Sequence, residues 1–200
     1  MHRGASSPSP SSRSAGRGAL KLASALDAFG LDVRGLLCAD FGANVGGFTD
    51  CLLRRGAARV HALDAGYGQL AWTLRKDPRV VVRERANVLH CAAAEAVDLV
   101  VIDLGWTPQH LSVPAALRWL KPAGRIVSLV KPHYELAHVL GRPPEKTLSP
   151  AEAREVLRKV RSRLADLRAD VLNEAASPVA GKGGNQEFFL LIAPASEKEL

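Results

Sequence analysis

One stretch, residues 36–50, constrains the fold of this chain more than any other. A short apolar run at residues 36–39 predicts a buried strand. The chain then passes through a glycine-rich turn into residues whose apolar side chains suit the inner face of a helix. A strand, a glycine-rich turn and a helix form the opening unit of a nucleotide-binding α/β fold. The residues of the turn on which this interpretation depends are Asp40, Gly42, Gly46, Gly47 and Phe48.

The spacing of these glycines excludes two common phosphate-binding motifs. Gly42 and Gly46 stand too far apart for the dinucleotide pattern G-x-G-x-x-G, and no Lys-Ser/Thr pair follows as in a P-loop. An acidic residue that closes the strand, here Asp40, suits a ligand with positive charge near its ribose. S-adenosylmethionine (SAM), with a sulfonium and an ammonium group, is such a ligand. An ordinary tight turn between a strand and a helix explains the same residues, and this stretch alone leaves both interpretations open.

The composition restricts the class of protein. Apolar residues make up 47% of the chain and charged residues 24%, which is ordinary for a soluble globular protein. The net charge of +7 favours a polyanionic partner, nucleic acid before a membrane. No apolar run approaches the length of a membrane span, and the first eighteen residues have no apolar stretch of a secretory signal. The three cysteines lie in apolar contexts and form no C-x-x-C pair, and the histidines show no metal-ligand spacing. We therefore expect a cytoplasmic protein with reduced cysteines and no metal.

The length of 200 residues is sufficient for one domain with a substantial core. We expect that domain over residues 17–195, after a disordered tail at residues 1–16 that is rich in Ser, Pro, Gly and Arg. Arg3, Arg13 and Arg17 make the tail basic, which suits contact with an RNA backbone. A solvated terminus explains the same residues.

Strands that alternate with helices predict a mostly parallel sheet covered on both faces. Beyond the first strand, we expect strands at residues 58–63, 79–83, 97–102, 124–130, 167–172 and 187–192. The expected helices lie at residues 19–29, 111–120 and 150–164, and another begins at residue 67.

Charged residues stand at the expected carboxyl ends of four strands, namely Asp40, Asp64, Asp103 and Lys131. In parallel sheets, ligands bind outside the carboxyl ends of the strands. Asp64 closes the second strand, where an acid commonly takes the ribose hydroxyls of a bound nucleotide. Structural capping explains each charge singly, but it does not easily explain the set.

Three motifs, in this order, resemble the FtsJ-like ribose 2'-O-methyltransferases, and within that family the hemolysin A/TlyA group. They are Asp-Phe-Gly-Ala-Asn-Val-Gly-Gly-Phe at residues 40–48, Ala-Leu-Asp-Ala-Gly-Tyr-Gly-Gln-Leu at 62–70 and Leu-Val-Lys-Pro-His-Tyr-Glu at 129–135. The resemblance runs from about residue 17 to residue 192. It implies an α/β fold, the Rossmann-like fold of SAM-dependent methyltransferases. In that fold a seven-stranded, mostly parallel sheet has helices on both faces and its last strand inserted antiparallel.

The resemblance also implies a site and an activity. The catalytic tetrad of the family, Lys-Asp-Lys-Glu, matches Lys21, Asp103, Lys131 and Glu187. Lys131 is the expected base and Asp103 its orienting partner, while Lys21 and Glu187 are expected to hold the ribose and Lys131. The implied activity is ribose 2'-O-methylation, with ribosomal RNA or a ribosomal subunit as the partner. The SAM contacts that we expect are Asp40, Gly42, Gly46, Gly47, Phe48, Asp64, Asn87 and Asp103.

The chain departs from the pattern of the group in two places. The group carries a small RNA-binding domain before the methyltransferase domain, where this chain has only a short basic tail. The stretch after Asp103, Leu-Gly-Trp-Thr-Pro, differs from the more usual Val-Ser-Phe and indicates a tuned substrate pocket.

Two alternative functions remain open at this stage. One is a non-catalytic RNA-binding relative that keeps the fold, and the intact glycines and tetrad argue against it. The other is a methyltransferase for small molecules or proteins, and the basic charge and the two lysines argue against that.

Overall fold

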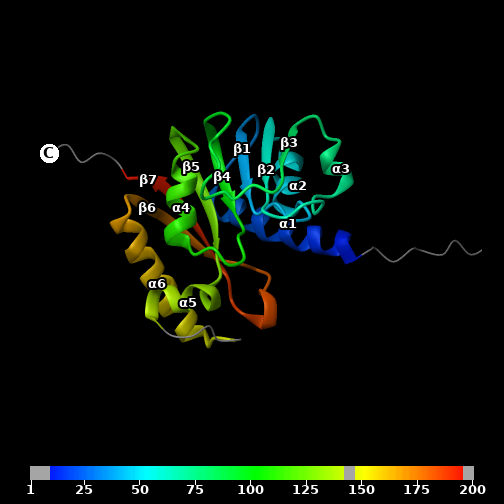
Figure 1. Ribbon diagram of the computed structural model, residues 1–200. Helices are drawn as coiled ribbons and strands as arrows, with labels where there is room; N and C mark the ends of the chain where they lie inside the picture. The colour runs from blue at the N-terminus through cyan, green and yellow to red at the C-terminus, as the bar shows by residue number, and fades with distance from the viewer. Residues whose placement is uncertain (1–9, 142–146, 196–200) are drawn as a thin grey trace, which may run out of the picture.

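The computed structural model describes residues 10–141 and 147–195 and places seven strands in one sheet, with helices on both faces (Figure 1). The elements in chain order are α1 (Pro10–Phe29), β1 (Leu37–Phe41), α2 (Gly47–Arg54), β2 (Arg59–Leu63), α3 (Trp72–Arg75), β3 (Val80–Arg83), β4 (Val97–Ile102), α4 (Gln109–Leu117), β5 (Leu120–Val130), α5 (Pro132–Leu140), α6 (Pro150–Asp166), β6 (Ala169–Ala176), the 3-10 turn η1 (Lys182–Gly184) and β7 (Phe188–Pro194).

The strands lie in the order β3-β2-β1-β4-β5-β7-β6. The first five run parallel to their neighbours, and β7 runs antiparallel between β5 and β6. This is the expected sheet, with the last strand inserted antiparallel. Because β7 runs against β5, its first residue lies beside the last residue of β5, and Phe188 pairs with Val130. The start of β7 and the carboxyl ends of the parallel strands therefore share one edge.

Two apolar layers hold the helices on the sheet. The helices α1, α2 and α3 pack on one face, and α4, α5 and α6 pack on the other. Successive residues of a strand point to opposite faces, so Cys38 lies in the layer under α1 and α2 while Ala39 lies in the layer under α4 and α6. In α1, Leu22 and Leu26 are fully buried, and each contributes about 1.5–3 kcal/mol by leaving water.

The first helix begins earlier than the sequence predicts. It starts at Pro10, so residues 10–16, which were expected to be part of a disordered tail, are helical. A proline fits the first turn of a helix because the N–H that it lacks would have no partner there. Residues 1–9, the rest of the expected tail, lie outside the described residues.

Several other bounds differ from expectation, and three of these differences are the largest. The fifth strand starts at Leu120 rather than at residue 124, because the Pro122–Gly124 stretch, which resembles a turn in the sequence, lies within β5. The pairing of β5 with β4 is irregular there, with a shift in register between Val97 and Leu99 of β4. The helix expected from residue 67 is the single turn α3, and Gly68 before it has a left-handed backbone. The sixth strand runs to Ala176.

The connection at residues 141–149 is described only in part, because residues 142–146 lie outside the described residues. In the part of the chain that is described, no helix is both long and apolar enough to cross a membrane.

Candidate active site

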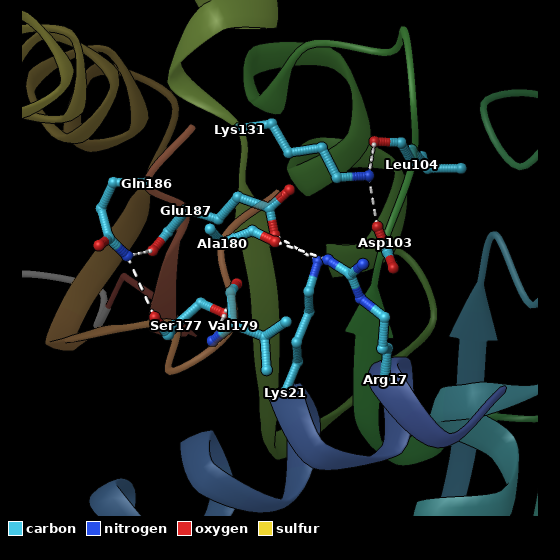
Figure 2. A network of polar contacts seen from close by, with 10 residues as sticks. All are labelled: Arg17, Lys21, Asp103, Leu104, Lys131, Ser177, Val179, Ala180, Gln186 and Glu187. Carbon is cyan, nitrogen blue, oxygen red and sulfur yellow. Dashed lines mark hydrogen bonds and ion pairs between the residues drawn. The ribbon is translucent and has the colours of Figure 1, made fainter. Parts of the chain in front are cut away.

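Four ionisable side chains from four different elements converge at the carboxyl edge of the sheet (Figure 2). Lys21 comes from α1, Asp103 follows β4, Lys131 follows β5 and Glu187 precedes β7. The structure thus brings together the whole tetrad expected from the sequence, in two ion pairs.

The first pair joins Lys131 to Asp103. The Nζ atom of Lys131 lies 2.5 Å from Asp103 Oδ1 and donates a hydrogen bond of 3.1 Å to the carbonyl oxygen of Leu104. Lys131 has an extended backbone, with φ −112° and ψ 91°, and Pro132 begins α5 directly after it. A proline disfavours the helical conformation in the residue before it. The backbone therefore leaves β5 in the extended form that the sequence predicts and carries Lys131 toward Asp103.

The second pair joins Lys21 to Glu187. Lys21 Nζ lies 2.5 Å from Glu187 Oε2, and the side chain of Glu187 is only 3% exposed. The backbone of Glu187 is fixed as well, since its carbonyl accepts a hydrogen bond of 2.8 Å from Ser177 N at the end of β6. The ion pair therefore ties the first helix to the last strand, across 166 positions of the chain.

A glycine that the sequence analysis did not single out makes room for this pair. A Cβ atom on Gly181 would lie 2.6 Å from Glu187 Cδ. The backbone of Gly181 is extended, with φ −73°, so glycine is needed here for space and not for its conformation. In the sequence, Gly181 resembles a member of a flexible turn with Gly183 and Gly184, and no local pattern separates it from them.

Arg17 lies one helical turn before Lys21 on α1. Its Nη2 atom donates a hydrogen bond of 2.8 Å to the carbonyl oxygen of Ala180. The segment that carries Gly181 and Glu187 is thus attached to α1 at two successive turns. The expected contact of Arg17 with an RNA backbone stays a prediction.

A cleft of about 490 Å³ opens beside Asp103. Its lining includes Gly42, Asp64, Asn87 and residues 103–107. The two carboxylate oxygens of Asp64 accept hydrogen bonds from backbone amides, Oδ2 from Asn44 N at 2.8 Å and Oδ1 from Gly66 N at 2.7 Å. A carboxylate oxygen has more than one acceptor site, so Asp64 is oriented and can still accept hydrogen bonds from a ligand.

The glycines of the turn after β1 are required by packing. Gly42 has φ 89°, and a Cβ atom there would lie 2.6 Å from the carbonyl oxygen of Asp103. Gly46 has φ 99°, and a Cβ atom there would lie 2.9 Å from Leu70 Cδ1. These left-handed backbones favour glycine. The turn can therefore lie directly against the end of β4, where the cleft begins.

Four of the expected cofactor contacts lie deeper than the sequence predicts. Asp40 is fully buried within β1, because the strand continues to Phe41, and its Oδ2 accepts a hydrogen bond of 2.7 Å from Thr49 Oγ1. Phe48 is buried on α2, and its ring centre lies 6.1 Å from that of Phe189. Both side chains lie in the core and not among the residues that line the cleft. Gly46 and Gly47 shape the turn, are also buried and do not line the cleft.

The electrostatic character of the cleft suits a cationic ligand. The pKa of Asp40 is raised to about 7, chiefly by burial and in smaller part by the nearby carboxylates of Asp103 and Asp64, while the hydrogen bonds with Thr49 oppose the rise. Asp40 Oδ1 has no hydrogen-bond partner among the described residues. Asp64 and Asp103 thus line the cleft, with Asp40 buried behind the turn, and the residues present fit the sulfonium and ammonium groups of SAM.

The aromatic ring at the mouth of the cleft belongs to the stretch that departs from the family pattern. Trp106 is 80% exposed, and its ring centre lies 4.6 Å from that of Tyr134 on α5. The stretch that departs from the family pattern therefore lines the cleft beside Asp103.

The strand order, the antiparallel β7 and the cleft at the carboxyl edge define a Rossmann-like methyltransferase. The chain belongs to the FtsJ-like methyltransferase family, which matches residues 14–193. Among its relatives, the 16S/23S rRNA (cytidine-2'-O)-methyltransferase TlyA of Mycobacterium tuberculosis is 44% identical over 188 residues, which cover 92% of this chain and 70% of that protein. Hemolysin A of Brachyspira hyodysenteriae is 32% identical, over 84% of this chain and 72% of that protein.

A solved structure agrees with the same family. A protein from Streptococcus thermophilus that carries the name hemolysin has a TM-score of 0.82 and 32% identity, over 90% of this chain and 66% of that chain. The resemblance deduced from the three motifs is therefore confirmed.

Proposed function

We propose that this protein is a SAM-dependent methyltransferase that modifies the 2'-hydroxyl of a ribose in ribosomal RNA, with its catalytic domain at residues 17–195. The observation that carries the proposal is the Lys131–Asp103 pair, which lies at the cleft beside the second pair of the tetrad. TlyA, the relative from M. tuberculosis, is named for cytidine 2'-O-methylation of 16S and 23S rRNA, and this supports ribosomal RNA, free or in a subunit, as the substrate.

The cleft is the proposed site for SAM. Asp64, Asn87 and Gly42 line it, and the two amides that orient Asp64 leave its carboxylate able to accept the ribose hydroxyls. When bound, SAM supplies an electrophilic methyl group to an oxygen nucleophile. The chain must hold that oxygen in line, and positioning of this kind supplies about 7–11 kcal/mol in favourable cases.

Lys131 is the proposed base. The ammonium of Lys131 first loses a proton to solvent; the amine at Nζ then takes the proton of the ribose hydroxyl, and the carboxylate of Asp103, 2.5 Å away, stabilises the ammonium that forms again. Lys21 and Glu187 face the same point from α1 and β7 and hold the ribose (Figure 2). Because Glu187 is neutralised by Lys21, the buried carboxylate does not oppose the approach of the phosphate-rich substrate.

An RNA substrate is supported by two further observations. The chain carries a net charge of +7, which favours a polyanion. The exposed ring of Trp106 stands at the mouth of the cleft, and aromatic rings are surfaces on which unstacked bases bind. We place this reaction in the cytoplasm, and the described cysteines are free thiols, as expected there.

Transfer of labelled methyl groups from SAM tests the proposal. The substrates are 16S rRNA, 23S rRNA and purified ribosomal subunits, and the control is the Lys131→Ala variant. We expect label on RNA at a linkage that resists alkaline hydrolysis, because a 2'-O-methyl group blocks that cleavage. Label on protein or on metabolites, but not on RNA, would overturn the proposal. Absence of SAM binding by calorimetry would instead identify a non-catalytic relative.

A further inference from the structure

The connection between β4 and α4, residues 103–108, carries groups that the proposed reaction needs. The carbonyl oxygen of Leu104 accepts a hydrogen bond from Lys131 Nζ, and residues 103–107 line the cleft. Gly105 and Trp106 within this connection are exposed. Its start is anchored by the hydrogen bond from Asp103 N to Phe41 O. The position of Leu104 and Trp106 therefore depends on how the far end, at the start of α4, is anchored.

That far end is held by a carboxylate from another helix. The backbone N–H of Gln109, the first residue of α4, donates a hydrogen bond of 2.8 Å to Glu135 Oε1 on α5. The first N–H groups of a helix have no partner within the helix. Pro108 precedes the helix and has no side-chain acceptor, so Glu135 does for α4 what a capping residue usually does. A negative charge at a helix N-terminus is also favoured by the helix dipole.

The side chain of Gln109 extends this anchor into the sheet. Its Oε1 atom accepts a hydrogen bond of 2.6 Å from Ser128 Oγ, and its Nε2 atom donates one of 3.2 Å to the carbonyl oxygen of Leu129. Ser128, Gln109 and Glu135 are each at most 4% exposed. Buried polar groups are costly unless they are hydrogen-bonded, so three of them in one contact make a specific junction between α4, β5 and α5. We call these three residues the buried latch.

Glu135, one of the three residues of the latch, lies in the first turn of the helix that Lys131 caps. Lys131 caps the N-terminus of α5, and the N–H of Glu135 donates a hydrogen bond of 3.3 Å to the carbonyl oxygen of Lys131. The contacts therefore close a ring, from Lys131 through Glu135 to Gln109, and back along the connection to Leu104, which contacts Lys131 Nζ. Movement of the connection would change the position of the amine.

We propose that Glu135 is a positioning residue for methyl transfer, which acts through the buried latch by fixing the 103–108 connection against Lys131. This inference rests on the proposed function and assigns a role in it to a residue outside the tetrad. Burial raises the pKa of Glu135 to about 7, and both its ionised and its neutral form retain an acceptor oxygen for Gln109.

Three variants and a control test this role in single-turnover methyl transfer with saturating SAM and rRNA. Glu135→Ala removes the acceptor, and we expect the rate per SAM-binding molecule to fall by about 10–100-fold, since small misplacements of reacting groups have effects of this size. Glu135→Gln keeps an acceptor oxygen and should stay within about threefold of the wild type. Ser128→Ala removes one bond of the latch and should fall between the two. Glu155→Gln, at an exposed carboxylate on α6 that pairs with Arg158, is the matched control.

Expressing the rate per SAM-binding molecule separates positioning from folding. A residue that contributes only to stability lowers the number of SAM-binding molecules when it is changed, but each remaining molecule transfers methyl groups at the same rate. A rate for Glu135→Ala within threefold of the wild type would overturn the inference, and so would an equal loss in Glu135→Gln. If Glu135→Ala does not fold, Ser128→Ala decides, and an unchanged rate in that variant overturns the inference.

Hydrogen exchange makes the outcome independent of the proposed function. The Gln109 amide should exchange at least tenfold faster in Glu135→Ala, or in Ser128→Ala if that must replace it, while amides of α1 are unchanged. A wild-type protein that methylates no RNA would remove the proposed function and with it a role in methyl transfer. An unchanged Gln109 exchange rate would remove the latch itself.

Discussion

Gly181 lies against the carboxylate of Glu187, so closely that a Cβ atom at position 181 would come within 2.6 Å of Glu187 Cδ. The side chain of Glu187 cannot easily give way, since it is 3% exposed and pairs with Lys21. A glycine in a loop thus determines where the last member of the tetrad stands.

Gly181→Ala should lower the single-turnover rate of methyl transfer at least tenfold, because the added methyl group displaces the Glu187 carboxylate from Lys21. The extended backbone at this position itself accepts alanine, but separating the buried carboxylate from Lys21 should also lower the free energy of unfolding, by about 3–5 kcal/mol if the pair is fully broken. Stopped assays and urea denaturation measure the two quantities. Gly16→Ala on α1, where a Cβ atom meets no neighbour within 4 Å, is the control. An unaltered rate would show that Glu187 can move without consequence.

Asp64→Ala should weaken SAM binding by about 1–3 kcal/mol, the contribution of a hydrogen bond to a charged group. Part of the loss arises because the backbone amides of Asn44 and Gly66, which donate hydrogen bonds to the carboxylate in the wild type, lose their acceptor in the variant. Asp64→Asn keeps one acceptor oxygen and should lose less. Isothermal titration with SAM measures both variants against Asp32→Asn, an exposed carboxylate paired with Arg34. Equal affinity in Asp64→Ala and the wild type would remove Asp64 from the site.

Lys131→Arg and Lys131→Ala should both abolish methyl transfer. Arginine stays protonated at all working pH values, so it cannot take the proton from the ribose hydroxyl even if it pairs with Asp103. SAM affinity should stay within about tenfold, or about 1.4 kcal/mol. Rate measurements and calorimetry on the same preparations check the two statements. Substantial turnover by Lys131→Arg would exclude Lys131 as the base and leave positioning as the main contribution of the site.

Asp40 should make the protein less stable as the pH rises from about 4 to about 7. An ordinary aspartate has a pKa of 3.8, whereas the pKa of Asp40 in the folded protein is about 7, chiefly because the side chain is buried. In that range the folded state binds more protons than the unfolded state, and stability therefore falls with rising pH. Asp40→Asn removes this contribution, which is a few kcal/mol at most, on the order of 1.4 kcal/mol per pKa unit.

Urea denaturation at several pH values compares Asp40→Asn with the wild type. The variant should show the smaller fall in stability between pH 4.5 and pH 7.5. Burial also raises the pKa of Glu135 to about 7, so Glu135 contributes part of the fall in stability in both the wild type and the variant. Parallel pH profiles would mean that Asp40 ionises freely in the folded state.

The sequence was sufficient for those parts of the fold that local pattern determines. The strand at Val97–Ile102 is almost wholly apolar because both of its faces are covered, and its predicted bounds are correct. Asp103 and Lys131 could be placed together because both follow parallel strands, whose carboxyl ends lie at one edge. The positions of Lys21 and Glu187 came from the family resemblance, since nothing local connects a residue of α1 with one before β7.

The parts that could not be predicted depend on tertiary proximity. Asp40 reads as the end of a strand, but β1 continues past it, and the carboxylate is enclosed by α2. Gln109 and Glu135 lie 26 positions apart and meet only because α4 and α5 pack on the same face. Residue type gives no sign of either contact, because a polar side chain at the end of a strand or in the first turn of a helix is equally compatible with exposure to solvent.

The antiparallel insertion of β7 has a consequence for the order in which the enzyme becomes active during its synthesis. A nascent chain that ends after β5 already contains Lys21, Asp103 and Lys131, but it lacks the strand that lies against β5 in the finished sheet. Glu187 and β7 are translated after all of the other strands of the sheet. A growing chain therefore completes its tetrad only some eighty codons after the cleft residues up to position 107 have been translated.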